Sequence, residues 1–265
     1  MSCRDAEKLG KLIGFGADHY IHGELSDLLA YLTNVRLSCD MFASHDCIEH
    51  VYDIESFMRG LREIPSRHLA VWLSTSANPL RRKTRRTLMR AQMKSEYEDR
   101  NREWGHKERD TQRSFLSVRK EMIVDADPDL CPRDVELLAK RTRGMRHDDI
   151  LQAVCEYKRS GLFPDPPTHP TNTCDPYTGN WAEHFMDPFE LCQVLRDEGF
   201  VTEVRPGYWE PTRIPKWKAF AKDFTNICIS VLGNRDLRIS PYYVICGAHC
   251  KDTERGGMGN ESYVT

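Results

Sequence analysis

Two continuous apolar runs in the first third of the chain constrain its fold most. The first, Leu37 to Ser44, has the sequence LSCDMFAS, and the second, Leu69 to Ser74, has the sequence LAVWLS. Between them, residues 54–64 carry apolar side chains at the spacing of a helix. Apolar strands that alternate with helices are typical of a parallel sheet that helices cover on both faces. The first third therefore predicts a doubly wound α/β sheet.

The last third of the chain returns to the same alternation. We expect a helix over 188–199, a strand over 200–204, a helix over 217–232 and a final strand over 240–246. Near the start, residues 5–13 are expected to form a helix that Gly14 ends, and residues 19–22 a short strand.

The middle of the chain, from Pro79 to about Ser160, predicts helices alone. A segment rich in Pro and Thr follows up to Tyr177 and is typical of a loop that crosses back to the sheet. Residues 1–78 and 178–250 are therefore expected to form the two parts of one α/β domain. A helical insertion with its crossover occupies 79–177, and 251–265 is expected to be a disordered tail.

Composition limits the class of protein. The 265 residues include 38 Lys and Arg against 40 Asp and Glu, and the formal net charge of -2 does not favour a nucleic-acid partner. No apolar stretch approaches the roughly 18 residues of a transmembrane helix, and the first residues lack the apolar segment of a signal peptide. The ten cysteines form no CxxC pair, which indicates scattered buried thiols. We expect a cytoplasmic protein without a membrane segment.

A basic run at the start of the insertion is the one local cluster of charge. No acidic residue interrupts it, and clustered cations can bind phosphates. It contains no aromatic side chain on which a base could stack, and acidic residues follow directly. We therefore expect a solvated helix face and no nucleic-acid partner. The run consists of Arg81, Arg82, Lys83, Arg85, Arg86, Arg90 and Lys94.

Two patterns together resemble the class I S-adenosylmethionine-dependent methyltransferases. In SCDMFASHDCIEHVYDIESFMRGLREI, a buried strand leads through an acidic turn with histidines into a helix. In that family, EHV and a helix follow the fourth strand of the sheet, and here the matching residues are Glu49, His50 and Val51. The segments PFELCQVLRDEGFVTEV and SPYYVICG resemble the fifth helix, the sixth strand and the closing strand.

The resemblance covers the chain in outline, apart from the helical insertion. It implies a Rossmann-like sheet and methyl transfer from S-adenosylmethionine to a small-molecule hydroxyl or amine. The insertion would then bind the acceptor.

The chain departs from that family at its beginning. A class I methyltransferase starts its sheet with a strand and a Gly-rich turn that approaches the cofactor. Gly14-Phe15-Gly16 is the candidate, but the charged segment before it predicts the end of a helix. The sheet is therefore expected to be incomplete at its N-terminus. An alternative function is a non-catalytic remnant that acts as a binding or dimerising partner, since unpaired strand edges favour a homo-oligomer.

Polar residues follow the predicted strand ends, where ligands bind in open α/β sheets. Glu24 is placed to accept a hydrogen bond from the adenine of the implied S-adenosylmethionine, and Ser44, His45 and Asp46 to meet its amino-acid end. His50 or His45 would act as the base for a hydroxyl acceptor. Polar residues also gather at strand ends without any ligand. The candidates for acceptor contacts are Asn78, Arg119, Arg143, Asp148, Asn172, Trp181, Glu183 and His184.

A divalent metal is a further candidate cofactor. Asp46, Glu49 and His50 are spaced i, i+3 and i+4, which places them on one face of a helix. Two carboxylates and an imidazole suit a hard cation, and His106 is a further candidate ligand.

The spacing is similar to the ExxEH pattern of the ubiquinone-pathway O-methyltransferases and of the small-RNA 3′-terminal 2′-O-methyltransferases, in which a metal engages substrate hydroxyls. A metal-assisted RNA 2′-O-methyltransferase is thus a third hypothesis. The same residues also fit a structural role, in which Glu49 caps the helix and His50 packs against the sheet.

Overall fold

The protein is an α/β fold with a mixed four-stranded sheet, seen in a computed structural model that describes residues 3–99, 113–210, 215–232 and 237–250. The strands are β1 (Met41–His45), β2 (His68–Thr75), β3 (Val201–Pro206) and β4 (Tyr243–Cys250). Their order is β1-β2-β4-β3; β1 and β2 are parallel, and β4 is antiparallel to both of its neighbours. The expectation of a parallel sheet is therefore confirmed for β1 and β2 only.

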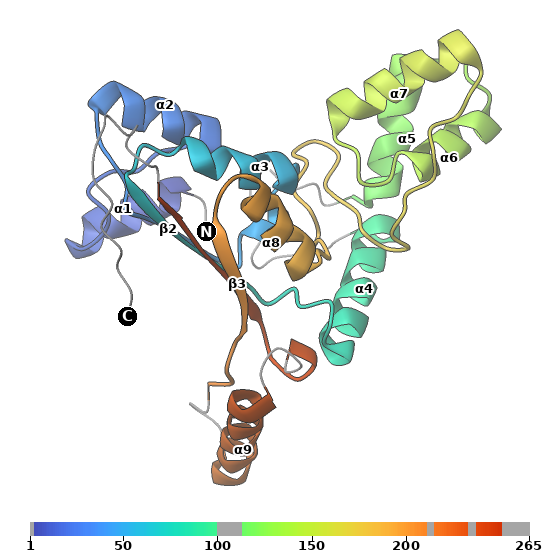
Figure 1. The fold of residues 1–265 in the computed structure, drawn as a ribbon. Helices are drawn as coiled ribbons and strands as arrows, with labels where there is room; N and C mark the ends of the chain where they lie inside the picture. Colours follow the sequence, from blue (N-terminus) through green and yellow to red (C-terminus); the bar gives the residue numbers. More distant parts are fainter. Residues whose placement is uncertain (1–2, 100–112, 211–214, 233–236, 251–265) are drawn as a thin grey trace.

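Three helices lie on one face of this sheet (Figure 1). They are α2 (Leu25–Val35), α3 (Ile54–Gly60), which a 3₁₀ turn at Leu61–Glu63 extends, and α8 (Pro188–Asp197). Leu69, Val71 and Leu73 alternate along β2 and are buried in the core beneath these helices, because alternate side chains of a strand point to the same face. The helices predicted over 54–64 and 188–199 are confirmed.

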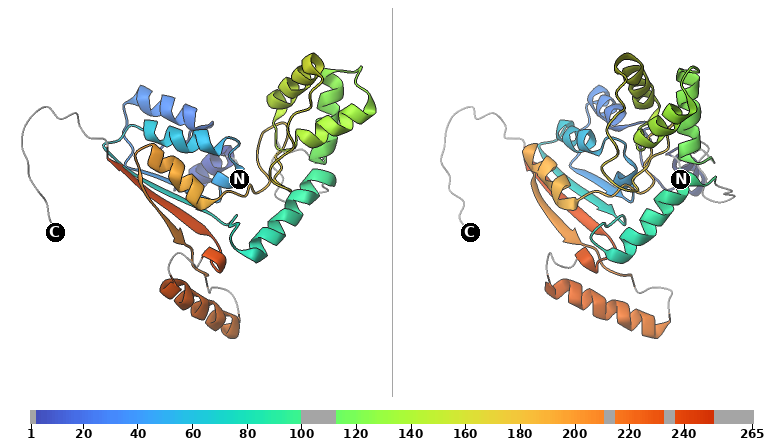
Figure 2. Two further views of the ribbon diagram at one scale, coloured as in Figure 1. Left: turned by 45° about the vertical axis from the view of Figure 1, so that its right-hand side comes forward. Right: turned by 90° about the vertical axis from the view of Figure 1, so that its right-hand side faces the viewer.

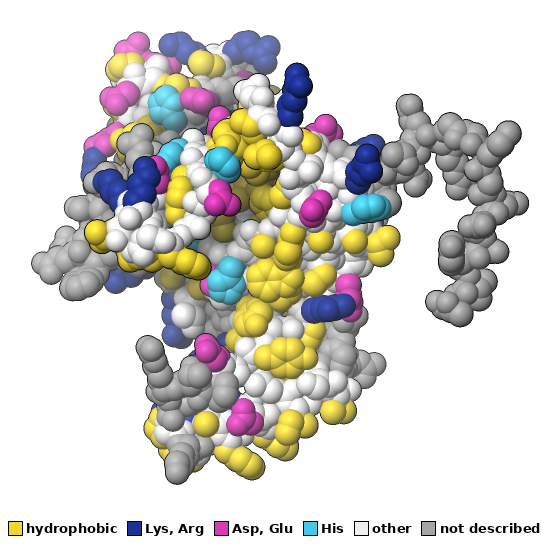
Figure 3. Space-filling model, turned by 90° about the vertical axis from the view of Figure 1, so that its left-hand side faces the viewer, with side chains coloured by type: hydrophobic (Ala, Val, Ile, Leu, Met, Phe, Trp, Pro, Cys, Tyr) yellow, Lys and Arg dark blue, Asp and Glu magenta, His cyan; other side chains and the backbone are white. Residues whose placement is uncertain are grey.

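The opposite face of the sheet keeps exposed side chains on all four strands. Met41, Ala70, Val201 and Ala248 lie on it, and Val201 is 81% exposed. Figure 3 shows apolar side chains gathered over this side of the molecule. The expectation of a sheet covered on both faces is therefore wrong for the part of the chain that the structure describes. We call this surface the open face.

The insertion forms a separate helical unit with its own core (Figure 2). It contains α4 (Arg82–Tyr97), α5 (Phe115–Ala126), α6 (Pro132–Arg141) and α7 (His147–Ser160), as the sequence predicts. Gly161 follows α7 with φ 70, the left-handed conformation that lets glycine end a helix. The cations of α4 from Arg82 onward are exposed, so the predicted solvated face is confirmed.

The remaining described α-helices are α1 (Cys3–Ile13) and α9 (Lys216–Leu232). Gly14 follows α1 with φ 64, which confirms that it ends this helix. The strand predicted over 19–22 is wrong, because those residues form a loop. The predicted tail, 251–265, and His106 lie outside the described residues. Within the described ranges, none of the helices combines the length and apolar character needed to span a bilayer.

Candidate functional site

The candidate site lies where the two parallel strands end together. His45 is the last residue of β1 and pairs in register with Ser74 near the end of β2. A 3₁₀ turn over Ile48–His50 follows β1 directly and contacts β2. The apolar strands thus bring a polar turn to the edge of the sheet at which ligands bind in α/β folds.

Asp46 and His45 tie the two strand ends together. Asp46 has the left-handed backbone conformation (φ 46), and its Oδ1 accepts a hydrogen bond from the Ser76 N–H at 2.7 Å. His45 Nδ1 lies 2.6 Å from Ser74 Oγ. The prediction that Asp46 shares one helix face with Glu49 and His50 is wrong, because the chain forms only a three-residue 3₁₀ turn that begins after Asp46.

The loop that follows the insertion along the chain packs on this turn. Trp181 N–H donates to the His50 carbonyl oxygen at 3.4 Å, and His184 N–H donates to the Glu49 carbonyl oxygen at 3.0 Å. His50 Nδ1 lies 2.8 Å from the Trp181 carbonyl oxygen. Because a carbonyl only accepts, His50 Nδ1 carries the hydrogen in this contact. The lone pair on His50 Nε2 is then available to a ligand, the arrangement typical of metal-binding histidines.

The loop adds Glu183 to Glu49 and His50. One ligand atom from each of these three side chains lies within 4.8 Å of the other two. Asp46 is not a member of this group. The sequence predicted Asp46 as the second carboxylate, and Glu183 occupies that position in the structure. We call these three residues the acidic cluster.

Glu49 is the buried member of the acidic cluster. Its side chain is 1% exposed, and its Oε2 has no hydrogen-bond partner within the described residues. Burial raises the pKa of Glu49 to about 7, although bonds from its own backbone and from Thr75 act in the opposite direction. The carboxyl group therefore exchanges its proton near neutral pH.

Two more buried polar atoms lack partners among the described residues; one lies near the Glu49 charge, and the other belongs to the loop whose backbone bonds Glu49. They are Tyr243 Oη and His184 Nδ1. Burial, with the Glu49 charge nearby, raises the pKa of Tyr243, so its hydroxyl keeps its hydrogen at neutral pH. Unpaired buried polar atoms are rare in folded proteins, and a group of them indicates space for water or a ligand.

A stack of aromatic rings lies on the loop that bonds the turn. The Trp181 ring stacks on His184 with centroids 4.2 Å apart and on Tyr52 with centroids 6.1 Å apart. Burial lowers the pKa of His184 to about 4, so this imidazole is neutral at neutral pH. Tyr52 Oη donates to Asp149 Oδ2 at 2.5 Å, which fixes the stack to α7.

The buried face of α4 holds the loop in position. Gln92 Nε2 donates to the Glu183 carbonyl oxygen at 2.8 Å and to Asn172 Oδ1 at 3.0 Å. Glu183 itself has the left-handed conformation (φ 61). The sequence does not reveal the role of Gln92, because a single Gln within a basic run gives no sign that it contacts a loop 80 residues away.

The predicted acceptor residues divide into three groups. Glu183 belongs to the acidic cluster, and Trp181 and His184 adjoin it through backbone hydrogen bonds to the turn. Asn172 contacts Gln92, which also bonds the Glu183 carbonyl oxygen. Arg119 is fully buried against Glu96 and the Ala139 carbonyl oxygen, and Asn78 is buried against the carbonyl oxygens of Leu237 and Ser240. These two side chains are bonded within the protein, and their contact with an acceptor stays a prediction.

The other two predicted acceptor residues are only partly engaged. Arg143 donates to the His169 carbonyl oxygen, and its Nε has no partner within the described residues. Asp148 lies at the exposed start of α7 beside His147. Within the described part of the chain, neither of them forms a hydrogen bond with the acidic cluster.

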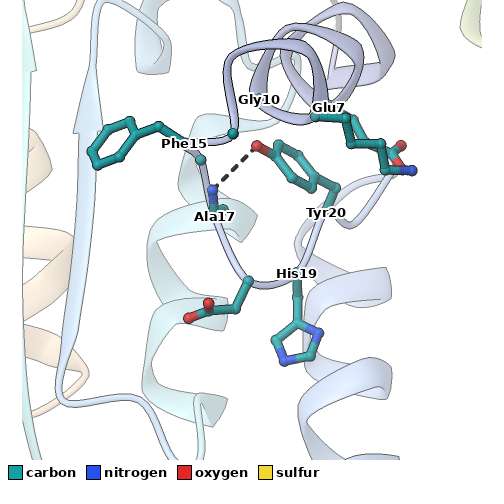
Figure 4. Close-up of a pocket in the computed structure, with 10 residues that line it drawn as sticks. Glu7, Gly10, Phe15, Ala17, His19 and Tyr20 are labelled. Carbon is teal, nitrogen blue, oxygen red and sulfur yellow. Dashed lines mark hydrogen bonds and ion pairs between the residues drawn. The ribbon is translucent and has the colours of Figure 1, made fainter.

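The predicted cofactor residues lie on separate elements. Glu24 is exposed at the start of α2, where its N–H donates to Asp27 Oδ2 at 2.7 Å, and Ser44 lies on β1 with its Oγ buried and without a partner among the described residues. The Gly-rich turn lines an open pocket of about 480 Å³ that shares no residue with the acidic cluster. In Figure 4 the Tyr20 hydroxyl points into this turn, where Ala17 N–H donates to it.

The chain matches no known family and no curated protein sequence when it is compared with them. What the protein does must therefore follow from the chemistry of the acidic cluster and its surroundings.

Proposed function

We propose that the chain carries the acceptor-binding part of an S-adenosylmethionine-dependent methyltransferase with a Rossmann-like sheet, and that its acceptor is a small-molecule hydroxyl or amine. One observation carries this proposal: the buried Glu49 carboxyl, with an unpaired oxygen, faces His50 and Glu183 at the common end of the parallel strands. The resemblance of the EHV segment and of the final helix and strands to that family supports the same function.

The acidic cluster suits the removal of a proton from an acceptor. A group whose pKa is about 7, like Glu49, is ionised in a large fraction of molecules at neutral pH and still binds a proton readily. An acceptor hydroxyl at Glu49 Oε2 would donate its hydrogen to the carboxylate. His50 Nε2 offers a second acceptor for the same proton, and the stacked Trp181 and His184 rings would hold an apolar or aromatic part of the molecule.

The three residues also fit a divalent cation. Two carboxylates and one imidazole form a donor set suited to Mg²⁺ or Mn²⁺, and the contact from His50 Nδ1 to a carbonyl oxygen orients the ring as in metal sites. Glu49, His50 and Glu183 would hold the ion. A cation bound there would lower the pKa of an acceptor hydroxyl.

The described residues fit S-adenosylmethionine less well. Within them, β1 is an edge strand, and the Gly-rich turn follows a helix, so neither supplies the strand and turn that approach a cofactor. The roles of Glu24, Ser44, His45 and Asp46 toward this cofactor stay predictions. The same open edge favours the alternative function, a non-catalytic domain that pairs with another polypeptide.

Calorimetric titration with MnCl₂ tests the acidic cluster. We expect wild-type protein to bind the ion, and Glu49→Gln and His50→Gln to bind it at least about 10-fold more weakly, because each removes a ligand. Glu63→Gln is the matched control, since Glu63 is exposed on the 3₁₀ turn after α3. Equal binding by all four proteins would contradict a cation site and leave Glu49 as a base alone.

Titration with S-adenosylmethionine tests the methyltransferase itself. A heat of binding, with a rise of Tm in millimolar cofactor, would support an enzyme. The absence of both would contradict the proposed activity and favour the non-catalytic alternative, whatever the result with MnCl₂. The two titrations thus test the acidic cluster and the cofactor separately.

A further inference from the structure

The helix α9 carries a stripe of large apolar side chains on its solvent-exposed side. These residues are between 60% and 77% exposed. Their spacing alternates between three and four residues over more than three turns of the helix, so they lie on one side of it. We call them the α9 stripe: Trp217, Phe220, Phe224, Ile227 and Val231.

The opposite side of α9 is the side that the rest of the chain contacts. Asn226 exchanges two hydrogen bonds with the Trp209 backbone, at 2.7 and 2.8 Å, and Ile229 is 1% exposed. Lys222 Nζ donates to the Glu210 carbonyl oxygen at 2.8 Å. The helix lies beyond the end of the sheet in both views of Figure 2. The α9 stripe therefore faces away from the domain, and this helix is anchored by its polar side.

We propose that the α9 stripe is a dimer interface, in which α9 packs antiparallel against α9 of a second copy of this chain. Alternation of three- and four-residue steps is the spacing of a coiled-coil seam, which buries a narrow stripe against another helix of the same spacing. A two-fold axis at Phe224, the central residue, gives each copy the same contacts.

The sizes of the side chains favour the antiparallel arrangement. The α9 stripe begins with Trp217 and ends with Val231, so its volume decreases along the helix. An antiparallel pair with its axis at Phe224 places the largest side chain opposite the smallest and Phe220 within one residue of the position opposite Ile227. A parallel pair would place two Trp side chains opposite each other and two Val side chains at the other end, which fills the interface unevenly.

The flanks of the stripe fit a protein partner better than an anionic membrane. The residues at its borders are Lys216, Ala221, Asp223, Cys228 and Ser230, which are three small side chains, one cation and one acid. Lys218 Nζ lies 5.3 Å from the centroid of the Trp217 ring. Helices that bind membrane surfaces carry Lys and Arg at this level, where lipid phosphates attract them. Small borders instead allow a second helix to approach closely.

The area is close to that of a specific interface. Three aromatic and two aliphatic side chains at these exposures present on the order of 600 Å² of apolar surface, because one aromatic side chain alone buries about 150–250 Å². Monomeric proteins rarely expose larger patches, and a standard interface buries about 800 Å² on each partner. Contacts at the borders of the stripe would supply the difference.

Sedimentation velocity over a range of concentrations tests the interface. We expect wild-type protein to form a dimer, and Phe224→Glu to raise the dissociation constant at least about 100-fold, because two carboxylates would meet at the two-fold axis. Val201→Glu is the matched control, since Val201 is 81% exposed on the open face and lies on β3 rather than on α9. Circular dichroism and thermal melting check that each variant is folded.

Exchange of charges tests the direction of the helices. Trp217→Glu and Val231→Lys should each weaken the dimer, and the double variant should regain affinity, because antiparallel helices place the new opposite charges together. A double variant that stays monomeric would overturn the antiparallel arrangement.

Three results would overturn the interface itself. The first is a wild-type protein that stays monomeric at all concentrations. The second is a dimer that Val201→Glu breaks and Phe224→Glu does not. The third is a monomer that floats with vesicles of phosphatidylcholine and phosphatidylglycerol, and that no longer does so when Phe224 is replaced by Glu.

Discussion

The two faces of the sheet are made by the same four strands and differ in what covers them. On the covered face, Leu73 and Ile245 are fully buried beneath helices. On the open face, Ala70 and Val201 are exposed at comparable positions of the strands. The acidic cluster belongs to the covered side, because Glu49 hydrogen-bonds Thr75, which shares a face with Leu73. The burial that stabilises the core therefore also raises the pKa of the Glu49 carboxyl.

The largest effect is expected from removing volume on the covered face. Leu73→Ala should lower the free energy of unfolding by about 4 kcal/mol, because it leaves a cavity in a fully buried position. Denaturation in urea, followed by circular dichroism, measures this loss. A loss below about 1 kcal/mol would mean that the covered face is not close-packed.

The next effect is expected from Glu49→Gln. The ordinary pKa of 4.5 is raised to about 7 in the folded protein, so ionisation of the buried carboxyl opposes folding as pH rises through this window. The substitution should therefore raise the free energy of unfolding by about 3 kcal/mol at pH 8 and leave it nearly unchanged at pH 4. Urea denaturation at the two pH values provides the measurement, and an effect of equal size at both would contradict the raised pKa.

A smaller effect of opposite sign is expected from His184. Its pKa falls from 6.5 to about 4 on folding, so the unfolded chain binds the proton more tightly and stability is lost as pH falls through this range. The lowered pKa of His184 should reduce the free energy of unfolding by about 2 kcal/mol at pH 5 relative to pH 8. We expect His184→Gln to reduce the loss of unfolding free energy between these pH values, and His147→Gln, at an exposed position, to leave it unchanged.

The smallest effect is expected on the open face. Val201→Thr should change the free energy of unfolding by less than about 0.5 kcal/mol, because the side chain is 81% exposed and threonine also favours strands. A loss of 2 kcal/mol or more would show that another surface covers Val201 in solution. Repeating the denaturation at several protein concentrations would then reveal whether that surface belongs to a second copy.

Local patterns predicted the elements well and their partners poorly. The run over 69–74 is β2, and the expected ends of α7 and α8 agree with the structure, because apolar spacing, Pro and Gly act over a few residues. The predicted strand over 19–22 is a loop in the structure, because a strand depends on pairing along its length, which a short local pattern does not reveal. Apolar runs alone did not reveal that one face of the sheet stays open.

The sequence by itself determined the alternation of helices and strands, the helical insertion, and the turn that places Glu49 and His50 after β1. Only the tertiary structure decided that Glu183, rather than Asp46, completes the acidic cluster. Side chains more than 130 residues apart meet because the loop that follows the insertion packs on this turn. The contact depends on α4 and on hydrogen bonds to backbone carbonyl groups. The spacing of residues along the chain cannot predict such a contact. The raised pKa of Glu49 follows from its burial, which only the folded chain provides.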